Sequence, residues 1–363
     1  KGALSDERRI VILGKTGAGK SSLANTIFGE ELFKISHDPN SETGKCQAKD
    51  KSVNGRSITL IDTPGFFDTD RSEEELKPEI VSCITECAPG PHAFLIVLKV
   101  ERYTKHEQEV INTICDNFSE EVFKYATVVF THGEQLSGQK IEDFVFKNRL
   151  ISDLVKKCGG RCYVIDNRYW NTNPTDEYRS NQHQVEELLK TIDKMVMKQN
   201  KSYYTNEMLQ KVEEMKILTE ENIRQESGNM TEEEIREEAK SRVYNVLIRL
   251  AGVGTGVFIG ALLGVAAMVG VVITALQIVP QLNQTLAAIG GAAEAPVIFG
   301  AIVGASAAVG AVIGGVEGYH AAEGADTPWE AAKRTAEAVE NQTLTVCSKA
   351  KDRMSQAKKT YNL

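Results

Sequence analysis

A glycine-rich segment near the N-terminus constrains the fold of this chain more than any other feature. The apolar run Ile10–Leu13 has the composition of a buried β-strand, residues 14–21 read GKTGAGKS, and helix-forming residues follow up to Phe28. A strand, this glycine spacing and a helix, in that order, predict a phosphate-binding loop. Its backbone N–H groups are expected to point at phosphate oxygens, aided by the positive end of the helix dipole. A chance glycine turn is the alternative, but it would not require both flanking elements.

The side chains of this loop have separate expected roles in binding a nucleoside triphosphate. Lys20 is expected to contact the β- and γ-phosphates as a mobile cation. The Ser21 hydroxyl is expected to bind Mg²⁺, a hard ion that prefers oxygen ligands. The other residues expected to line the phosphates are Gly14, Lys15, Thr16, Gly17, Ala18, Gly19 and Ser22.

A second motif, Asp62-Thr63-Pro64-Gly65, follows an expected strand at 57–61. Asp62 is expected to hold Mg²⁺ through a water molecule, and the Gly65 amide is expected to sense the γ-phosphate. Together the two motifs indicate an NTPase that switches between nucleotide states.

Between the two motifs lies a polar interval, residues 33–47, which contains Pro39 and Gly44 and is expected to form a mobile loop. Thr43 is the candidate in this loop for a Mg²⁺ ligand when the γ-phosphate is bound. Ser41 is the second choice, and a solvated Thr43 with no metal role is a further alternative.

Base recognition is expected from residues that follow two later strands. In Thr131-His132-Gly133-Glu134, the Glu134 carboxylate can accept hydrogen bonds from both N1–H and the exocyclic amine of guanine, which adenine cannot match. His132 is expected to lie over or beside the ring. On the other side of the base, Asn167 in Asp166-Asn167-Arg168 is the candidate for a direct hydrogen bond.

Composition limits the classes of partner. The net charge of −8 and the sequence pI of about 5.5 argue against nucleic acid as the main partner, because phosphate neutralisation would need a clustered positive surface. The cysteines, 7 in number and irregularly spaced, favour reduced thiols in the cytosol over a disulfide framework.

The first two parts of the chain differ in pattern. Residues 8–180 alternate short β-rich runs with amphipathic helices, which predicts an α/β fold with a mainly parallel sheet covered on both faces. Residues 181–243 change to long, charged, glycine-poor helices with apolar residues on one face. We expect this extension to pack on itself or on the first domain, with a coiled-coil oligomer seam as the alternative. The expected strands are 9–13, 57–61, 93–99, 127–130 and 162–165.

The third part, residues 244–319, is apolar and rich in glycine. Residues 250–279 and 295–316 contain no charged side chain, and each is long enough to cross ~30 Å of hydrocarbon as a helix. Basic residues flank the pair, so we predict a membrane hairpin with both chain ends, including a tail helix over 320–363, in the cytosol. Glycines at four-residue spacing favour close helix contacts, within one chain or between copies. A buried soluble hairpin is the alternative, because Ala and Gly lower the hydropathy.

These motifs resemble those of the GTPases of immunity-associated proteins, the GIMAP or IAN family, which is related to septins and chloroplast Toc GTPases. The resemblance covers residues 8–200, and its most specific stretch is GPHAFLIVLKVERYTKHEQEVI at 90–111. It implies a Ras-like G domain with extra helices, binding of GTP and GDP with Mg²⁺, and GTP-dependent dimerisation through the nucleotide face. Some members carry C-terminal hydrophobic anchors. The other segments that carry the resemblance are GKTGAGKSSLANTIFG (14–29), SETGKCQ (41–47), DTPGFFDT (62–69) and FTHGEQL (130–136).

Hydrolysis is expected to be slow, because Phe66 follows Asp-Thr-Pro-Gly where many GTPases place a water-orienting glutamine. Arg102, within the family-specific stretch, is the candidate catalytic residue. Its planar guanidinium suits charge stabilisation on the phosphates of a partner across a dimer. The alternative is an ordinary surface Arg in the loop after a strand.

The sequence therefore predicts a GTP-binding switch protein associated with immunity, whose low intrinsic GTPase activity is stimulated by dimerisation. We expect it to be anchored to the cytosolic face of an intracellular membrane, of the endoplasmic reticulum or another organelle, and to assemble in its GTP state. Two alternatives remain: a non-hydrolysing GTP-dependent membrane scaffold, and a membrane-inserting or pore-like protein controlled by the G domain.

Overall fold

The described residues divide into two units: the first runs to residue 244 and includes 262–264, and the second comprises the other described residues from 245 to 276. Thr43, its alternative Ser41, the second expected apolar helix at 295–316 and the expected tail helix at 320–363 lie outside the described residues. The computed structural model describes residues 7–35, 46–67, 72–170, 177–200, 202–226, 229–248, 250 and 254–276.

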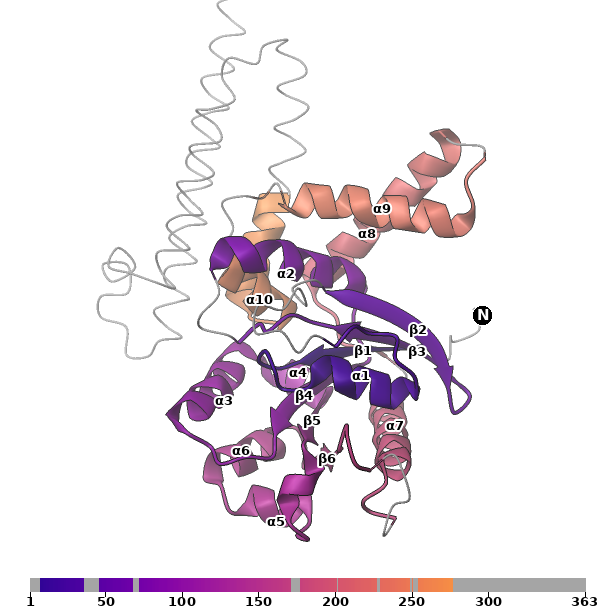
Figure 1. Cartoon of the computed structure of the whole chain (residues 1–363). Helices are drawn as coiled ribbons and strands as arrows, with labels where there is room; N and C mark the ends of the chain where they lie inside the picture. The colour runs from indigo at the N-terminus through magenta and orange to yellow at the C-terminus, as the bar shows by residue number, and fades with distance from the viewer. Residues whose placement is uncertain are drawn as a thin grey trace, which may run out of the picture. The chain divides into compact units, whose positions relative to one another are not determined.

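A six-stranded sheet forms the centre of the first unit, in the order β2-β3-β1-β4-β5-β6 (Figure 1). Within it β2 and β3 are antiparallel, and the other neighbouring strands are parallel. Residues 93–98 of the central strand β4 are all buried, because helices cover both faces of a parallel sheet. The predicted α/β fold with a mainly parallel sheet is confirmed. The strands are β1 (Glu7–Leu13), β2 (Gln47–Val53), β3 (Arg56–Asp62), β4 (Ala93–Lys99), β5 (Ala126–Thr131) and β6 (Cys162–Val164).

The edge strand β2 is missing from the sequence-based prediction because its residues, QAKDKSV, are mostly polar and partly exposed. The Asn54-Gly55 pair is the signal that would have found it, since this dipeptide is typical of the two-residue turn of a β-hairpin. The φ angles of the pair, 49° and 77°, fit such a turn. Val53 and Arg56 on either side of it are paired in the sheet.

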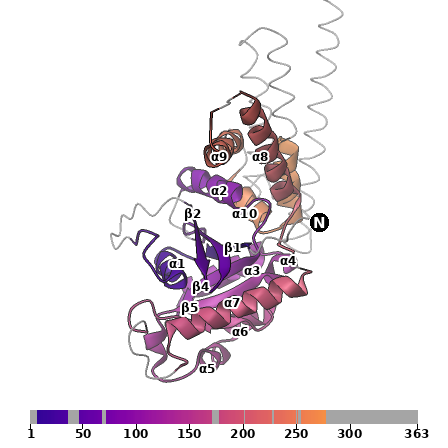
Figure 2. The same cartoon turned by 90° about the vertical axis from the view of Figure 1, so that its right-hand side faces the viewer.

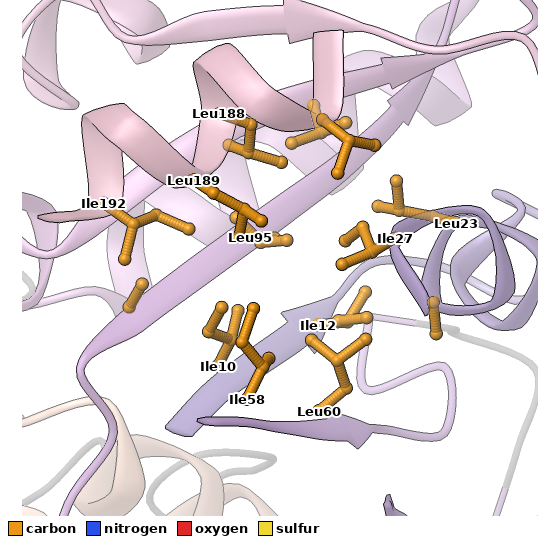
Figure 3. Packing of buried hydrophobic residues seen from close by; sticks show 14 of the residues in the cluster. Ile10, Ile12, Leu23, Ile27, Ile58, Leu60, Leu95, Leu188, Leu189 and Ile192 are labelled. Carbon is orange, nitrogen blue, oxygen red and sulfur yellow. The ribbon is translucent and has the colours of Figure 1, made fainter. Parts of the chain in front are cut away.

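Helices α1 (Lys20–Phe28) and α7 (Asn181–Lys198) cover one face of the sheet. Ile27 of α1 and Leu188 and Ile192 of α7 join one buried cluster with side chains of the strands (Figure 3). Burial of each such side chain stabilises the fold by about 1.5–3 kcal/mol. Helix α7 therefore packs on the sheet and belongs to the core of this domain, although its residues fall in the extension expected to begin at 181. The sheet covers the apolar face of α7.

The opposite face of the sheet carries further helices. Phe94 of β4 points away from the α1 and α7 side, because its neighbour Leu95 points toward it. The Phe94 ring centroid lies 6.4 Å from that of Phe118, which follows α3. The helices of this domain other than α1 and α7 are α2 (Glu73–Cys87), α3 (Lys105–Asn117), α4 (Glu120–Lys124), the 3₁₀ helix η1 (Gly133–Leu136), α5 (Ile141–Phe146) and α6 (Arg149–Lys157).

The linker after α7 is fixed to the sheet domain. The Tyr204 N–H donates a hydrogen bond to Pro91 O at 2.9 Å, and Thr205 Oγ1 donates one to Pro89 O at 2.8 Å. The buried Tyr204 ring contacts the Phe94 ring, with centroids 5.5 Å apart. These contacts lie just before β4, which is parallel to β1. The chain therefore leaves the sheet at the amino ends of the parallel strands, on the side opposite the loop that follows β1.

Two helices, α8 (Glu207–Glu226) and α9 (Glu232–Ile248), form the extension. They lie next to α2 (Figure 2), and Lys240 Nζ of α9 is 3.1 Å from Glu86 Oε2 of α2. Ile223, Ile235 and Ala239 pack the two helices on each other. The predicted helical extension is confirmed.

The first expected membrane helix, over residues 250–279, needs correction, because its described part is not one continuous helix. It consists of α10 (Thr255–Leu262) and a second helix, Ala266–Leu276, bent by 113°. Gly264 at the bend has a φ of +82°, a left-handed conformation that glycine adopts without a steric penalty. Of the helices in the described ranges, none is by itself long and apolar enough to cross a bilayer, while this bent pair meets both criteria jointly.

Candidate nucleotide-binding site

The residues expected to bind nucleotide follow the carboxyl ends of parallel strands, at one edge of the sheet. Residues 14–22 follow β1, Asp62 ends β3, and Arg102 lies shortly after β4. His132 follows β5 and Asn167 follows β6. This is the edge at which open α/β sheets bind their ligands.

The phosphate loop, residues 14–19, lies close to the end of β5. Gly19 has a φ of +90°, and a Cβ atom added to it would lie 3.3 Å from both Thr131 Cγ2 and Asn167 Nδ2. Thr131 Oγ1 donates a hydrogen bond to Ala18 O at 2.8 Å. Glycine is therefore required at the last position of the loop, where the chain turns into α1.

Lys20 is the buried cation at the start of α1. Its side chain is 8% exposed, and its Nζ donates a hydrogen bond to Lys15 O at 3.0 Å. This contact keeps the ammonium group against the backbone of the phosphate loop. Thr16 and Gly17 are exposed on the loop, and Ser22 is partly exposed in the first turn of the helix.

Ser21 and Asp62 form the candidate metal site. Ser21 Oγ donates a hydrogen bond to Asp62 Oδ2 at 2.5 Å. Burial raises the pKa of Asp62, although the Ser21 hydrogen bond and the charge of Lys20 act to lower it. Asp62 Oδ1 is buried and has no hydrogen-bond partner among the residues that the structure describes. A buried carboxylate oxygen without a partner, next to a hydroxyl, fits the oxygen donors that hydrated Mg²⁺ prefers.

The residues after Asp62 are held close to the sheet. Thr63 Oγ1 donates a hydrogen bond to Ile12 O at 2.6 Å. Gly65 and Phe66 are both buried. Because Phe66 has no polar side-chain atom, it cannot orient an attacking water molecule in the way that glutamine does.

Asp166 organises the region expected to bind the base. Its buried carboxylate accepts hydrogen bonds from the N–H groups of Glu134 at 2.9 Å, Arg168 at 2.8 Å and Tyr169 at 2.6 Å. Burial acts to raise the pKa of Asp166, but these bonds and a contact with the Glu134 side chain outweigh it, so the pKa is lowered. Asp166 thus joins the segment of Glu134 to the segment of Asn167.

The Glu134 side chain lies at the exposed rim of this region. Partial desolvation and then the contact with Asp166 raise the pKa of Glu134. A neighbouring carboxylate disfavours the charged form, whereas hydrogen-bond donors favour it. Two donors from a base would therefore offset this repulsion.

The other two expected base contacts, His132 and Asn167, are also at this edge. His132 has a φ of 61°, and its Nδ1 lies 3.0 Å from Thr131 Oγ1. Burial and then the charge of Lys99 lower the pKa of His132, which favours a neutral ring. Asn167 Oδ1 accepts a hydrogen bond from Thr26 Oγ1 of α1 at 3.0 Å, so its amide lies against α1 and the phosphate loop.

Trp170 is a residue of this region that no motif indicates. It is 8% exposed, and a Cβ atom added to Gly133 would lie 2.7 Å from its ring. Trp170 therefore packs directly on the backbone beside Glu134. The available sequence signal is weak: an aromatic pair, Tyr169-Trp170, shortly after the last strand.

Arg102 lies in the loop between β4 and α3, beside the phosphate loop. Its neighbour Glu101 has an Oε1 atom 3.9 Å from Lys15 Nζ. The Arg102 side chain itself is exposed. It is therefore accessible to a second molecule that contacts this edge of the sheet.

A sequence profile of the AIG1 family matches residues 8–223 of the chain, and these residues include every part of the site described above. The chain belongs to the AIG1 family. Among its relatives, the AIG1 proteins named immune-associated nucleotide-binding proteins and GTPase IMAP family members confirm the resemblance predicted from the motifs.

Two relatives show the extent of the likeness. The AIG1 chain is 37% identical to immune-associated nucleotide-binding protein 8 of Arabidopsis thaliana over 214 residues, 56% of this chain and 58% of that protein. It is 30% identical to GTPase IMAP family member 8 of Homo sapiens over 200 residues, 55% of this chain and 29% of that protein. The match thus covers less than two thirds of the length of either relative.

Among solved structures, the AIG1 chain is similar to Toc33 from Arabidopsis thaliana in complex with GDP and Mg²⁺. The TM-score is 0.43 and the sequence identity 21%, over 55% of this chain and 88% of that chain.

Proposed function

We propose that this AIG1 chain is a GTP-binding switch that hydrolyses GTP slowly. The observation that carries the proposal is the Ser21 hydroxyl, 2.5 Å from Asp62 Oδ2, beside a buried Asp62 Oδ1 that has no hydrogen-bond partner within the described part of the chain. Lys20 supplies a buried cation at the same place. The geometry suits a polyphosphate chain with its metal ion.

Mg²⁺ would be held by Ser21, by Asp62 through water, and by Thr43. When bound, it would neutralise charge on the β- and γ-phosphates. The chain's own contribution would be to position the nucleotide. Backbone N–H groups of the phosphate loop would bind the phosphates, and the Lys20 ammonium group, which donates to Lys15 O in this structure, would contact them.

Guanine is the base that the site suits best. Glu134 offers a carboxylate acceptor at the rim, next to Asp166, and two donors on one edge of the base satisfy it. Guanine presents two adjacent donors, N1–H and the exocyclic amine, whereas adenine presents an acceptor beside its amine. The neutral His132 ring and the amide of Asn167 would border the base on either side.

Hydrolysis is proposed to depend on a second copy of the chain, which meets the first across the nucleotide face. Phe66 supplies no group to orient water, so the intrinsic rate is low. Arg102 is exposed at this face and is proposed to stabilise the charge that develops on the partner's phosphates.

Replacing Arg102 by Ala is expected to lower GTP turnover at high protein concentration by at least about tenfold, the effect of losing one charge-assisted hydrogen bond in the transition state. The affinity for GTP is expected to stay unchanged. Phosphate release measured against protein concentration checks both. Arg149→Ala, at a side chain 95% exposed on α6, is the matched control. Undiminished turnover at high concentration in the Arg102 variant would refute the proposed role of Arg102 on the partner's phosphates.

A non-hydrolysing scaffold is the other candidate, and Phe66 is the observation in its favour. Single-turnover phosphate release separates the two functions. Release of phosphate from bound GTP under single-turnover conditions supports the GTPase. Tight GTP binding and assembly without phosphate release would support the scaffold.

We also propose that the apolar C-terminal region attaches the switch to the cytosolic face of an intracellular membrane. Its support is the uncharged composition of residues 250–279 and 295–316 and the bent pair of apolar helices at 255–276. The full chain is expected to float with liposomes both when GDP is bound and when a GTP analogue is bound, because a membrane anchor does not depend on the nucleotide. Flotation confined to the GTP analogue would favour a membrane-inserting device controlled by the G domain, and no flotation in either state would refute both.

A further inference from the structure

Lys15 of the phosphate loop forms ion pairs with Glu101, in the loop that carries Arg102, and with Glu107, in the first turn of α3. Lys15 Nζ lies 2.7 Å from Glu107 Oε1, which is 92 positions away in the sequence, and 3.9 Å from Glu101 Oε1. The Lys15 and Glu107 side chains are only 20% and 15% exposed. Solvent therefore screens this pair less than it screens the exposed ion pairs of the surface helices.

Glu107 has a second partner on the Arg102 side. It is the third residue of α3, and its Oε2 accepts a hydrogen bond from the Thr104 N–H at 3.0 Å and contacts Thr104 Oγ1 in a capping box. The two carboxylate oxygens thus face different elements, Oε1 the phosphate loop and Oε2 the end of the Arg102 loop. The bond from Lys15 and then those from Thr104 lower the pKa of Glu107 to about 2, so the carboxylate stays charged at neutral pH.

Tyr103 holds the same loop from the other side. Its hydroxyl donates a hydrogen bond to Lys99 O at 3.2 Å, and its ring centroid lies 6.4 Å from that of Phe144. Both residues that flank Arg102, Glu101 and Tyr103, are partly buried, while Arg102 is exposed. The loop is therefore fixed by its neighbours and presents Arg102 outward.

We propose that Glu107 is a positioning residue for Arg102, acting through its ion pair with Lys15. The pair joins the Arg102 loop to the phosphate loop, so that Arg102 already faces outward, toward a second copy of the chain, before that copy arrives. Fixing a catalytic group before the partner arrives lowers the entropic cost of reaching the transition state. This inference rests on the proposed role of Arg102 across a dimer.

Glu107→Gln is the variant that tests the inference. Glutamine serves in a capping box as glutamate does, so α3 keeps its N-terminus, but the charge opposite Lys15 is lost. In the full chain, the concentration-dependent part of GTP turnover is expected to fall about fivefold, from the loss of one partly buried ion pair. The GTP dissociation constant and the turnover at low protein concentration are expected to change less than about twofold.

Three further variants test whether the effect of Glu107→Gln comes from the ion pair with Lys15 and acts through Arg102. Thr104→Ala removes the capping hydroxyl but keeps the ion pair, and it is expected to retain the stimulation. Glu107→Asp keeps the charge on a shorter side chain and is expected to lie between the wild type and Glu107→Gln. Arg102→Ala combined with Glu107→Gln is expected to be no slower than Arg102→Ala alone, because the two residues act in one step.

The outcomes separate this inference from the function on which it rests. Stimulation that persists in Arg102→Ala would refute both the proposed role of Arg102 across the dimer and this inference. Stimulation lost in Arg102→Ala but kept in Glu107→Gln would refute the positioning role alone. A Glu107→Gln chain that loses GTP affinity along with stimulation would show that Glu107 supports the phosphate loop itself, which also contradicts the proposal.

Discussion

Replacing Lys20 by Ala is expected to weaken GTP binding on the order of 100- to 10,000-fold. Two charge-assisted hydrogen bonds to the phosphates would be lost, each contributing about 1.5–3 kcal/mol. Titration of a fluorescent GTP analogue into the nucleotide-free chain measures the effect. A change in affinity of less than about threefold would contradict the assignment of the phosphate site.

The Lys20 variant needs a control for folding, because its side chain is only 8% exposed. Thermal unfolding of the nucleotide-free variant supplies one, and a midpoint close to that of the wild type shows an intact fold. Lys156→Ala is the matched surface variant, since the Lys156 side chain on α6 is 73% exposed and lies on an element without a proposed nucleotide contact. It is expected to bind GTP as the wild type does.

Replacing Glu134 by Ala is expected to remove most of the preference for GTP over ATP. The affinity for GTP should fall on the order of 100-fold, because two charge-assisted hydrogen bonds to guanine are lost. The affinity for ATP should change little, since adenine does not use this acceptor. Paired titrations with GTP and ATP check the prediction, and Glu142→Ala, at an exposed acid on α5, is the control. An unchanged GTP-to-ATP ratio would show that another group selects the base.

The sequence allowed prediction of the parts of the fold that are set locally. The strand before the phosphate loop and the buried strand β4 contain apolar runs of the right length, and the strand that ends at Asp62 has apolar residues at Ile58, Leu60 and Ile61, so their patterns are clear. The edge strand β2 has no such pattern, because an edge next to solvent accepts residues such as Lys49 and Asp50. The apolar face of α7 was recognised, but its pattern does not say whether a sheet or another helix covers it.

The bend at Gly264 shows a second reason why part of the fold could not be predicted from the sequence. Residues 250–279 are uniformly apolar, and their composition is compatible with one long helix. The structure instead turns the chain at Gly264, where the preceding Leu263 accepts a hydrogen bond from the Ser119 N–H at 3.0 Å. A tertiary contact to a residue so distant in sequence leaves no local signal.

The residues of the candidate site also divide into those that the sequence identifies and those that only the fold reveals. Lys20, Ser21 and Asp62 belong to motifs whose spacing follows from the geometry of phosphate binding, so they could be named from the sequence. Asp166, Trp170 and the Lys15–Glu107 pair could not, because each acts by joining segments that the fold brings together. Asp166 holds the Glu134 segment through a backbone N–H group, which any residue type supplies.

Titration of the purified full chain with GTP and with ATP, in buffer containing Mg²⁺, tests the central claim most directly. We predict saturable binding of one GTP per chain, with ATP at least about 100-fold weaker, the discrimination expected from two charge-assisted hydrogen bonds. Equal affinity for the two nucleotides, or failure of the chain to retain GTP or GDP, would contradict the account.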